Sequence, residues 1–188
     1  MNDDQDLVHR ALRGDQGAFE MIVRRYQQPV LNYVGRMVRE RELALDISQD
    51  VFLKVYAGLR SYRPQYKFST WLFKVASNYM IDYWRKKKIA TQSLDHGFDD
   101  GEEDGPPIQV AADEPSVGRQ YELRELRGKI DAAIAELPPA LRELFVWRHV
   151  NGLSYEEMAE IKGIPVGTVK NRVFLAKEKM KELLERTP

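Results

Sequence analysis

The sequence predicts an all-α protein made of two small helical domains joined by a flexible acidic linker. Apolar residues recur at the helical spacing of about 3.6 positions through most of residues 3–88 and again from Tyr121 onward. Residues 93–120 are rich in glycine, proline and acid and lack this period, so they are too polar to fold alone. Near the C-terminus, two short helical patterns flank a glycine. The expected domains are residues 1–92 and 121–188, with the linker over 93–120.

The composition excludes several classes of site. The chain of 188 residues has no cysteine, which rules out disulfides and thiolate metal sites. Its three histidines (His9, His96 and His149) form no pair at metal-ligand spacing, so neither a metal nor another cofactor is expected. No Ser/His/Asp group or phosphate-binding glycine loop is present, so we do not expect an enzyme. No apolar run approaches the ~20 residues of a membrane span and the start is acidic, which predicts a cytoplasmic protein without membrane insertion.

Charge is distributed unevenly along the chain. The net charge is zero, but residues 1–92 carry 16 Lys and Arg against 10 Asp and Glu. Residues 93–120 carry eight acids and one base, Arg119. Because a polyanion interacts with the charge of a segment, the N-terminal segment is compatible with nucleic-acid binding. The linker is either a plain tether or a mimic of a nucleic-acid strand in a basic channel.

The N-terminal segment predicts three helices in succession. A short amphipathic helix stops at Gly14 and Asp15, and a second continues to about Met37 with a kink or break at Pro29. A third helix spans about residues 42–60. Its outer face carries four residues, Asp46, Gln49, Asp50 and Leu53. This face is either a solvated acidic surface or a contact for a basic protein partner.

The segment over residues 61–88 mixes aromatic rings with cations. It predicts an ordered loop to Phe68 and a helix from about Ser69. One broad face of that helix should be core, with Leu72, Phe73, Ala76, Met80, Tyr83 and Trp84. The opposite face carries Trp71, Lys74, Asn78, Asp82 and Arg85.

This mixture has two interpretations. Aromatic rings interleaved with cations form surfaces for unstacked bases, with stacking worth about 1–3 kcal/mol per base. The alternative is that Tyr62, Tyr66 and Trp71 only cover the end of the bundle, and that the basic run over residues 85–88 is a solvated helix end.

The C-terminal segment predicts about four helices, and the last two form a helix-turn-helix. The first should have a core stripe of Leu123, Leu126, Ile130, Ala133, Ile134 and Leu137, and a second follows Pro139. Ser154 and Glu157 predict a capping box at the start of the third helix, and Gly163 can adopt the left-handed conformation at its end. Pro165 is tolerated in the first turn of the final helix. The second helix of such a pair enters the DNA major groove.

The final helix divides into two faces by its phase. The packed face should hold Val169, Val173, Ala176, Met180 and Leu183. Elsewhere stand Lys170, Asn171 and Lys181, which suit phosphates or base edges, and Phe174 and Leu175, which could meet a thymine methyl group. The alternative is that Leu175 packs on a neighbouring helix and Phe174 is an isolated exposed aromatic.

Three segments of the chain resemble the extracytoplasmic-function (ECF) sigma factors of bacterial RNA polymerase. They are DISQDVFLKVY (residues 46–56), FSTWLFKVASNYMIDYWRK (68–86) and ELPPALRELFVWRHVNGLSYEEMAEIKGIPVGTVKNRVFLAKEKM (136–180). Their order, the acidic linker and the length also resemble that family, so the resemblance covers nearly the whole chain.

The resemblance implies a role for each domain. The first would be the sigma-two module, which docks on the clamp coiled coil of the largest polymerase subunit through Asp46, Gln49, Asp50 and Leu53. It would capture a flipped base of the promoter minus-ten element through Tyr62, Arg63, Tyr66, Lys67, Trp71, Lys74, Asn78 and Arg85. The last would be the sigma-four module, which touches the flap of the second-largest subunit. It would recognise the minus-thirty-five duplex through Thr168, Lys170, Asn171, Phe174, Leu175 and Lys181. The linker would thread the basic cleft of the polymerase.

The resemblance also bears on regulation and on one departure from the family. No further domain follows Pro188, so a separate anti-sigma factor that answers a stress signal is the expected regulator. Many members carry a basic residue where Leu175 stands. A rival interpretation is a helix-turn-helix regulator that binds duplex DNA without core polymerase, although such a protein does not need the aromatic and basic surface of the first domain.

Overall fold

The structure, a computed structural model, describes residues 3–93 and 117–186, with side chains over 3–88 and 123–186. Every regular element in these ranges is helical, so the predicted all-α class is confirmed. The linker expected over 93–120 lies mostly outside the described residues, and its last four positions belong to a helix. The elements are α1 (Asp3–Leu12), α2 (Gln16–Val38), α3 (Arg41–Gly58), the 3₁₀ helix η1 (Leu59–Ser61), α4 (Phe68–Ser93), α5 (Val117–Glu136), α6 (Pro139–His149), α7 (Tyr155–Lys162) and α8 (Val166–Arg186).

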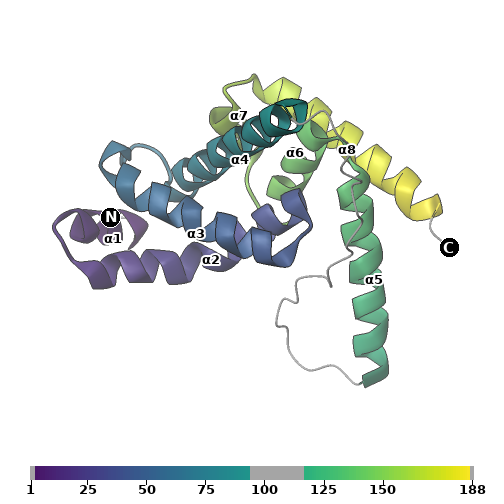
Figure 1. Cartoon of the computed structure of the whole chain (residues 1–188), viewed down its shortest axis with the longest axis horizontal. Helices are drawn as coiled ribbons and strands as arrows, with labels where there is room; N and C mark the ends of the chain where they lie inside the picture. Colours follow the sequence, from purple (N-terminus) through teal and green to yellow (C-terminus); the bar gives the residue numbers. More distant parts are fainter. Residues whose placement is uncertain (1–2, 94–116, 187–188) are drawn as a thin grey trace.

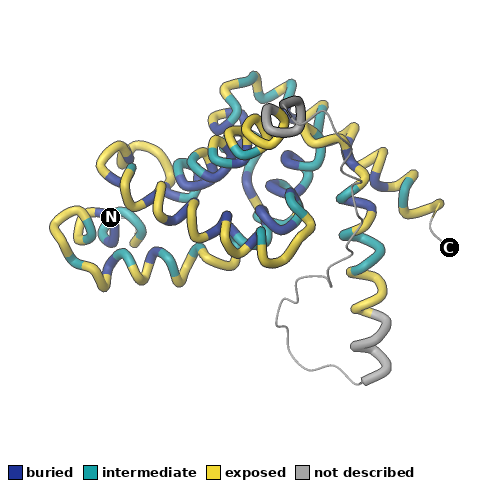
Figure 2. The backbone as a smooth tube through the Cα atoms, in the orientation of Figure 1, coloured by how far each residue is buried: buried dark blue, intermediate teal, exposed yellow. Residues whose placement is uncertain are grey.

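Helices α1 to α4 form the N-terminal half, purple to teal in Figure 1. Asp15 separates the first two helices: its carboxylate accepts hydrogen bonds of 3.1 Å from the Ala18 amide and 2.8 Å from the Arg10 side chain. The first of these satisfies a backbone donor that would otherwise be unpaired at the start of α2. Helix α2 packs along both α1 and α3, and Figure 2 shows the buried positions of the helices turned toward one another.

Of the kink or break expected at Pro29, the break is wrong, because α2 runs as one helix from Gln16 to Val38. Proline removes one backbone hydrogen-bond donor from the helix. The turn that follows Pro29 is nevertheless held by packing, because Val30 and Tyr33 are fully buried. Tertiary packing of this kind outweighs local propensity. The Pro29 carbonyl also accepts a hydrogen bond of 2.9 Å from the side-chain amide of Asn151 in the other half of the chain.

Helix α4 buries most of its predicted core face, with Leu72, Phe73, Ala76 and Met80 all inside. The assignment of Trp84 to the core is wrong, since it is 38% exposed, with its ring 5.3 Å from that of Tyr83. Almost every side chain from Ile81 to Lys88 is exposed, so this part of α4 has passed beyond the helices that cover its earlier turns.

Helices α5 to α8 form the C-terminal half. The core stripe of α5 is confirmed only in its second part, where Ala133, Ile134 and Leu137 are buried. Leu123 and Leu126 are exposed, because α5 extends away from the other helices in its first turns (Figure 1). The centre of this half is Trp147 in α6, which is fully buried.

The two halves pack against each other, α4 against α7 and α2 against α6. At this interface lies a buried set of side chains, the Glu143 cluster, formed by Tyr33, Ser77, Glu143 and Lys162. The Glu143 carboxylate accepts hydrogen bonds of 2.8 Å from the hydroxyls of Tyr33 and Ser77, and Lys162 Nζ lies 2.6 Å from its other oxygen. Burial, together with the Glu143 charge, raises the pKa of Tyr33 well above its ordinary value.

Candidate nucleic-acid interface

The loop between η1 and α4 is held in place by its own aromatic residues. The ring of Tyr62 is buried, with its centroid 5.4 Å from that of Phe68 and 5.8 Å from that of Trp71. Its hydroxyl donates a hydrogen bond of 2.8 Å to the Tyr66 carbonyl, and burial raises its pKa. The side chain of Gln5 in α1 donates to the Pro64 carbonyl at 2.6 Å. Tyr62 therefore packs beneath the loop, which is the place that the alternative interpretation gave it at the end of the helical bundle. Tyr66 remains 42% exposed.

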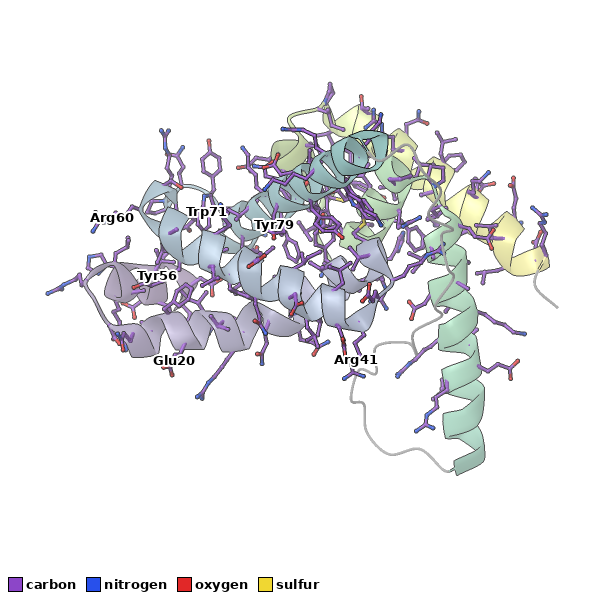
Figure 3. The ribbon with its side chains drawn as sticks, viewed as in Figure 1. Glu20, Arg41, Tyr56, Arg60, Trp71 and Tyr79 are labelled. Atoms are coloured by element: carbon purple, nitrogen blue, oxygen red, sulfur yellow. The ribbon has the colours of Figure 1, made fainter. Side chains whose placement is uncertain are left out.

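Beside this loop lies a hollow of about 460 Å³, which we call the strand pocket. In Figure 3, Trp71 is labelled on α4 and Arg60 on η1, the two elements that the loop connects. The pocket brings together five of the eight residues predicted for the minus-ten site. Its lining consists of Ser61, Arg63, Tyr66, Thr70, Trp71, Lys74, Val75, Asn78 and Glu160.

The other three predicted residues lie outside the strand pocket. Tyr62 lies under it, and Lys67 at its edge forms an ion pair of 3.1 Å with Glu157 in α7. Arg85 stands two turns beyond Asn78 and pairs with Asp82 at 3.2 Å. Thr70 and Val75 were missed by the sequence analysis, although their spacing from Trp71, Lys74 and Asn78 would have placed them on the same side of the helix. Glu160 comes from the other half of the chain, which no local pattern indicates.

The α3 stripe predicted as a protein contact is exposed along its whole length. Asp46, Gln49 and Asp50 face solvent, and Leu53 is 67% exposed. The hydroxyl of Tyr79 in α4 donates a hydrogen bond to Asp50, and partial burial with that carboxylate raises the pKa of Tyr79 to about 12. Tyr56, one turn after Leu53, is 59% exposed and was missed; Figure 3 shows it on α3 near α1.

The helix-turn-helix has the predicted local geometry. The Ser154 hydroxyl accepts a hydrogen bond of 3.1 Å from the Glu157 amide, and the Glu157 carboxylate accepts one of 2.7 Å from the Ser154 amide. Gly163 ends α7 with φ of 63°, in the left-handed region that glycine adopts without strain. The capping box and the turn are therefore confirmed.

Helix α8 presents most of its predicted DNA-binding residues to solvent. Val169, Val173, Ala176 and Met180 are buried, as the phase predicts, and Leu183 is half-buried. Phe174 is 59% exposed and Leu175 48% exposed, so Leu175 is not covered by a neighbouring helix. The remaining predicted contacts are also accessible, with Lys170, Asn171 and Lys181 exposed and Thr168 half-buried.

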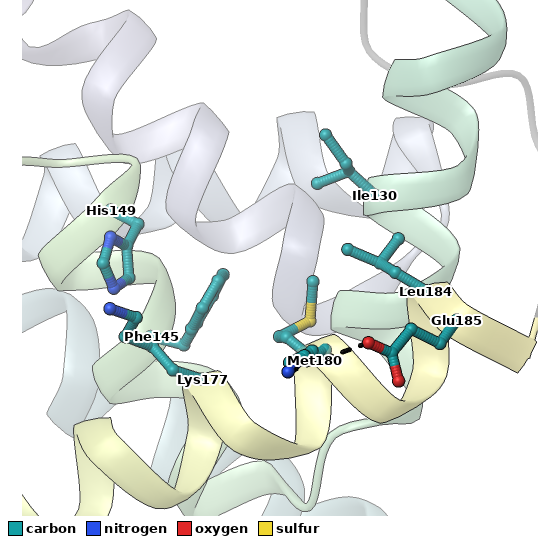
Figure 4. A pocket seen from close by; sticks show the side chains of 8 residues that line it. Ile130, Phe145, His149, Lys177, Met180, Leu184 and Glu185 are labelled. Atoms are coloured by element: carbon teal, nitrogen blue, oxygen red, sulfur yellow. Dashed lines mark ion pairs between the residues drawn. The ribbon is translucent and has the colours of Figure 1, made fainter.

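A second hollow, of about 530 Å³, lies between α5, α6 and α8 (Figure 4). We call it the apolar groove. Its floor is apolar, and cations stand at its edge: the lining is Ile130, Phe145, His149, Lys177, Met180, Lys181, Leu184 and Glu185. Partial desolvation, with the charges of Lys177 and Arg148, lowers the pKa of His149, whose side chain is still exposed on one side. The sequence analysis did not predict this groove.

Two kinds of feature are missing from the described part of the chain. No helix in it is long and apolar enough to cross a membrane. Within residues 3–93 and 117–186, no three side chains of the types that ligate metals gather at one place.

Comparison with known proteins places both halves in one family. Residues 22–89 match the family described as Sigma-70 region 2, and residues 127–180 match Sigma-70, region 4. The chain is 36% identical over 177 residues to the ECF RNA polymerase sigma-E factor of Escherichia coli strain K12, covering 93% of this chain and 91% of that one. It is 32% identical over 187 residues to the RNA polymerase sigma-H factor of Pseudomonas aeruginosa, covering 97% and 94%.

Solved structures agree on the fold. The structure of CnrH in complex with the cytosolic domain of CnrY aligns over 100% of both chains with a TM-score of 0.71 at 22% identity. The sigma factor RpoE in complex with the anti-sigma factor NepR from Bartonella quintana gives 0.70 at 24% identity, covering 90% of this chain and 98% of that one. The matches to regions 2 and 4 in the predicted order, and the identity along nearly the full length, lead to one conclusion: this chain belongs to the extracytoplasmic-function sigma factors of bacterial RNA polymerase.

Proposed function

We propose that this protein binds core RNA polymerase and directs initiation at particular promoters by capturing an unstacked minus-ten base and recognising the minus-thirty-five duplex. Sigma factors are transcription initiation factors and not enzymes, which agrees with the sequence-based expectation. The observation that carries the proposal is the strand pocket, in which aromatic, cationic and amide side chains line one hollow.

The chemistry of the strand pocket suits a base that has left the duplex. Trp71 and Tyr66 offer ring faces for stacking, Arg63 and Lys74 offer charge for the flanking phosphates, and Asn78 offers an amide for a base edge. Flipping a base costs a few kcal/mol, a loss that stacking and hydrogen bonds in such a pocket can offset. Its volume also lies in the range of about 300–1,000 Å³ typical of small-ligand sites.

Helix α8 supports the proposed recognition of a duplex. Lys170, Asn171 and Phe174 lie within one and a half turns and are all exposed, which is the disposition of a recognition helix in the major groove. The Nζ of Lys170 lies 5.7 Å from the centroid of the Tyr155 ring in α7. Thr168, Leu175 and Lys181 remain proposed contacts of the same surface.

Two surfaces are proposed for polymerase. The α3 stripe, with Asp46, Gln49 and Asp50 beside the exposed Leu53, combines acid and apolar area as a contact with a basic coiled coil requires. The apolar groove is a proposed site for the flap. Because one structural neighbour is named as a complex of the sigma factor RpoE with the anti-sigma factor NepR, an anti-sigma factor is a further proposed partner.

Run-off transcription tests this function. Core polymerase would be supplied with a library of genomic fragments, with and without the protein. We expect discrete start sites that appear only when the protein is present and that share two sequence elements upstream. A regulator of the rival kind would bind duplex DNA without core polymerase and would create no new start sites, and that result would overturn the proposal.

A further inference from the structure

Helix α1 contacts the loop beside the strand pocket through the side chain of Gln5. The side-chain amide donates a hydrogen bond of 2.6 Å to the carbonyl of Pro64, 59 positions later in the chain. Residues 63–66 form a turn that is closed by a hydrogen bond of 3.1 Å from the Tyr66 amide to the Arg63 carbonyl. The two residues that close the turn both line the strand pocket. Gln5 therefore binds the middle of a turn whose two ends belong to the proposed DNA site.

The carbonyl that Gln5 binds belongs to the central peptide of this turn, between Pro64 and Gln65. When the central peptide of a four-residue turn rotates to the type II form, its carbonyl points to the opposite side and the third residue takes a positive φ. In the described parts of the chain, Arg39 is the only residue other than glycine with a positive φ, so Gln65 is not in the rotated form. The bond from Gln5 stabilises the unrotated peptide, and with it the direction in which the chain reaches Tyr66.

Helix α1 is fixed by other contacts, so it can act as a support for the loop. With ten residues it is shorter than the helices that are stable alone in water. Its position depends on the buried side chains of Leu7 and Val8 and on an ion pair between Asp4 and Arg25 of α2. Removal of the Gln5 side chain leaves all of these contacts in place.

A series of aromatic contacts fixes the loop from the α2 side. Tyr26 of α2 donates a hydrogen bond of 2.6 Å to Asp4, and its ring centroid lies 5.5 Å from that of Phe68. Burial, together with that hydrogen bond, raises the pKa of Tyr26, so it remains a neutral donor near pH 7. Phe68 in turn contacts the ring of Tyr62, whose hydroxyl donates to the Tyr66 carbonyl. The rings hold the two ends of the loop, whereas Gln5 holds the turn between them.

We propose that Gln5 is a positioning residue for strand capture, which keeps the Arg63 guanidinium and the Tyr66 ring in place before a base leaves the duplex. The inference rests on the proposed function, since it assigns a supporting residue to the same pocket. Ordering a loop costs conformational entropy. A loop that is already ordered in the folded chain avoids this cost at the moment of binding, which strengthens capture without any contact between Gln5 and the strand.

Amide hydrogen exchange in the free full-length chain tests the effect on the turn. Gln5→Ala removes the donor and keeps a residue of high helix propensity in α1. We expect the Tyr66 amide to exchange about fivefold faster, because the turn opens more easily without the hydrogen bond to its central peptide. Gln27→Ala, at an exposed glutamine of α2, is the control and should keep the wild-type exchange rate.

Promoter opening tests the effect on capture. Core polymerase with the full-length chain would be mixed with a linear template that carries a promoter found by run-off transcription, with 2-aminopurine in the minus-ten element as a fluorescent reporter. For Gln5→Ala, the opening rate constant at saturating polymerase should fall by about fivefold. The concentration that gives the half-maximal rate should stay unchanged, because α8 still recognises the duplex. A chain that only folded less completely would lower the amplitude of the signal and not the rate constant.

Two further substitutions at position 5 separate the donor from the charge. Gln5→Lys restores a donor and should open the promoter within about twofold of the wild-type rate. Gln5→Glu cannot donate and should be at least as slow as Gln5→Ala. A wild-type opening rate in Gln5→Ala beside a slow Gln5→Glu would be an effect of charge alone and would overturn the positioning role.

Three other results would overturn it as well: unchanged exchange of the Tyr66 amide in Gln5→Ala, an equal loss of rate in Gln27→Ala, or a Gln5→Lys variant as slow as Gln5→Ala. Run-off transcription with the wild-type chain separates the two proposals. Start sites that depend on the protein, together with unchanged opening in Gln5→Ala, keep the proposed function and remove only the role of Gln5. The absence of such start sites removes the function and this inference with it.

Discussion

The hydroxyl of Tyr33 in α2 donates a hydrogen bond of 2.8 Å to the carboxylate of Glu143 in α6, 110 positions later in the chain. The two side chains are buried at the interface between the sigma region 2 and region 4 halves, and the ring of Tyr33 also lies 5.7 Å from that of Trp147. One tyrosine thus joins the polar and the apolar parts of that interface.

Tyr33→Phe should lower the free energy of unfolding by about 1.5 kcal/mol, because Glu143 loses one donor of a charge-assisted hydrogen bond and keeps two. Urea denaturation monitored by circular dichroism measures this loss. Tyr83→Phe, in a partly buried tyrosine of α4 outside the Glu143 cluster, should stay within about 0.5 kcal/mol. Equal losses in the two variants would show that the Tyr33–Glu143 hydrogen bond contributes no more to the free energy of unfolding than the hydroxyl of Tyr83 does.

Leu53→Ala should weaken binding to core polymerase by about tenfold without changing stability. Leu53 is 67% exposed, so the folded chain alone gains little from its side chain, whereas burial against a partner would gain about 1.5 kcal/mol or more. Affinity can be measured by anisotropy of a labelled chain titrated with core. Leu12→Ala, at an exposed leucine of α1, is the matched control, and an equal loss there would remove the α3 stripe from the contact.

Asn78→Ala should impair promoter opening on linear duplex and leave binding to core intact. Asn78 is exposed and lines the strand pocket, where its amide is available for a base edge. Run-off yield from a linear template should fall by about tenfold, which corresponds to the loss of one specific base contact. Gln27→Ala changes an exposed amide of α2 and should have no effect. Unchanged transcription from the Asn78 variant would exclude this residue from the site.

Phe174→Ala should reduce initiation only where the minus-thirty-five element contributes. The side chain is 59% exposed on α8, so stability should change by no more than about 0.5 kcal/mol. Loss of an apolar contact with a base edge should lower transcript yield by about tenfold on the intact promoter. On a template with a scrambled minus-thirty-five element the variant and the wild type should be equal, and a persistent deficit there would assign Phe174 another role.

Features within one helix or turn were predictable from the sequence. The capping box of Ser154 and Glu157 depends on two residues three apart, and the left-handed turn at Gly163 depends on one. The helical spacing of Trp71, Lys74 and Asn78 likewise places them on one face of α4, and all three line the strand pocket. In each case the residues are close in the sequence, so the backbone conformation of one helix or turn is enough to fix their relative positions.

Features that need two distant segments were not predictable. Helical spacing of apolar residues extends through Tyr33, which is buried, but nothing in that spacing indicates that its hydroxyl meets Glu143. Glu160 has no local pattern around it that marks a site, and it lines the strand pocket only because α7 packs on α4. For Leu123, helical spacing predicted a buried face, but the side chain is 38% exposed because no other helix of the described ranges covers it.

His149 should make stability depend on pH within the neutral range. His149 is exposed on one side, but partial desolvation at the apolar groove and the charges of Lys177 and Arg148 lower its pKa in the folded chain, whereas the unfolded chain keeps the ordinary value of about 6.5. The unfolded state therefore binds more protons as the pH falls below about 6.5, and stability decreases until the pH has passed through the folded pKa. Thermal unfolding midpoints at pH 7.5 and 5.5 should differ less in His149→Gln than in the wild type. His9→Gln, at an exposed histidine of α1, should keep the wild-type difference, and an unchanged difference in both variants would show that the pH dependence arises elsewhere.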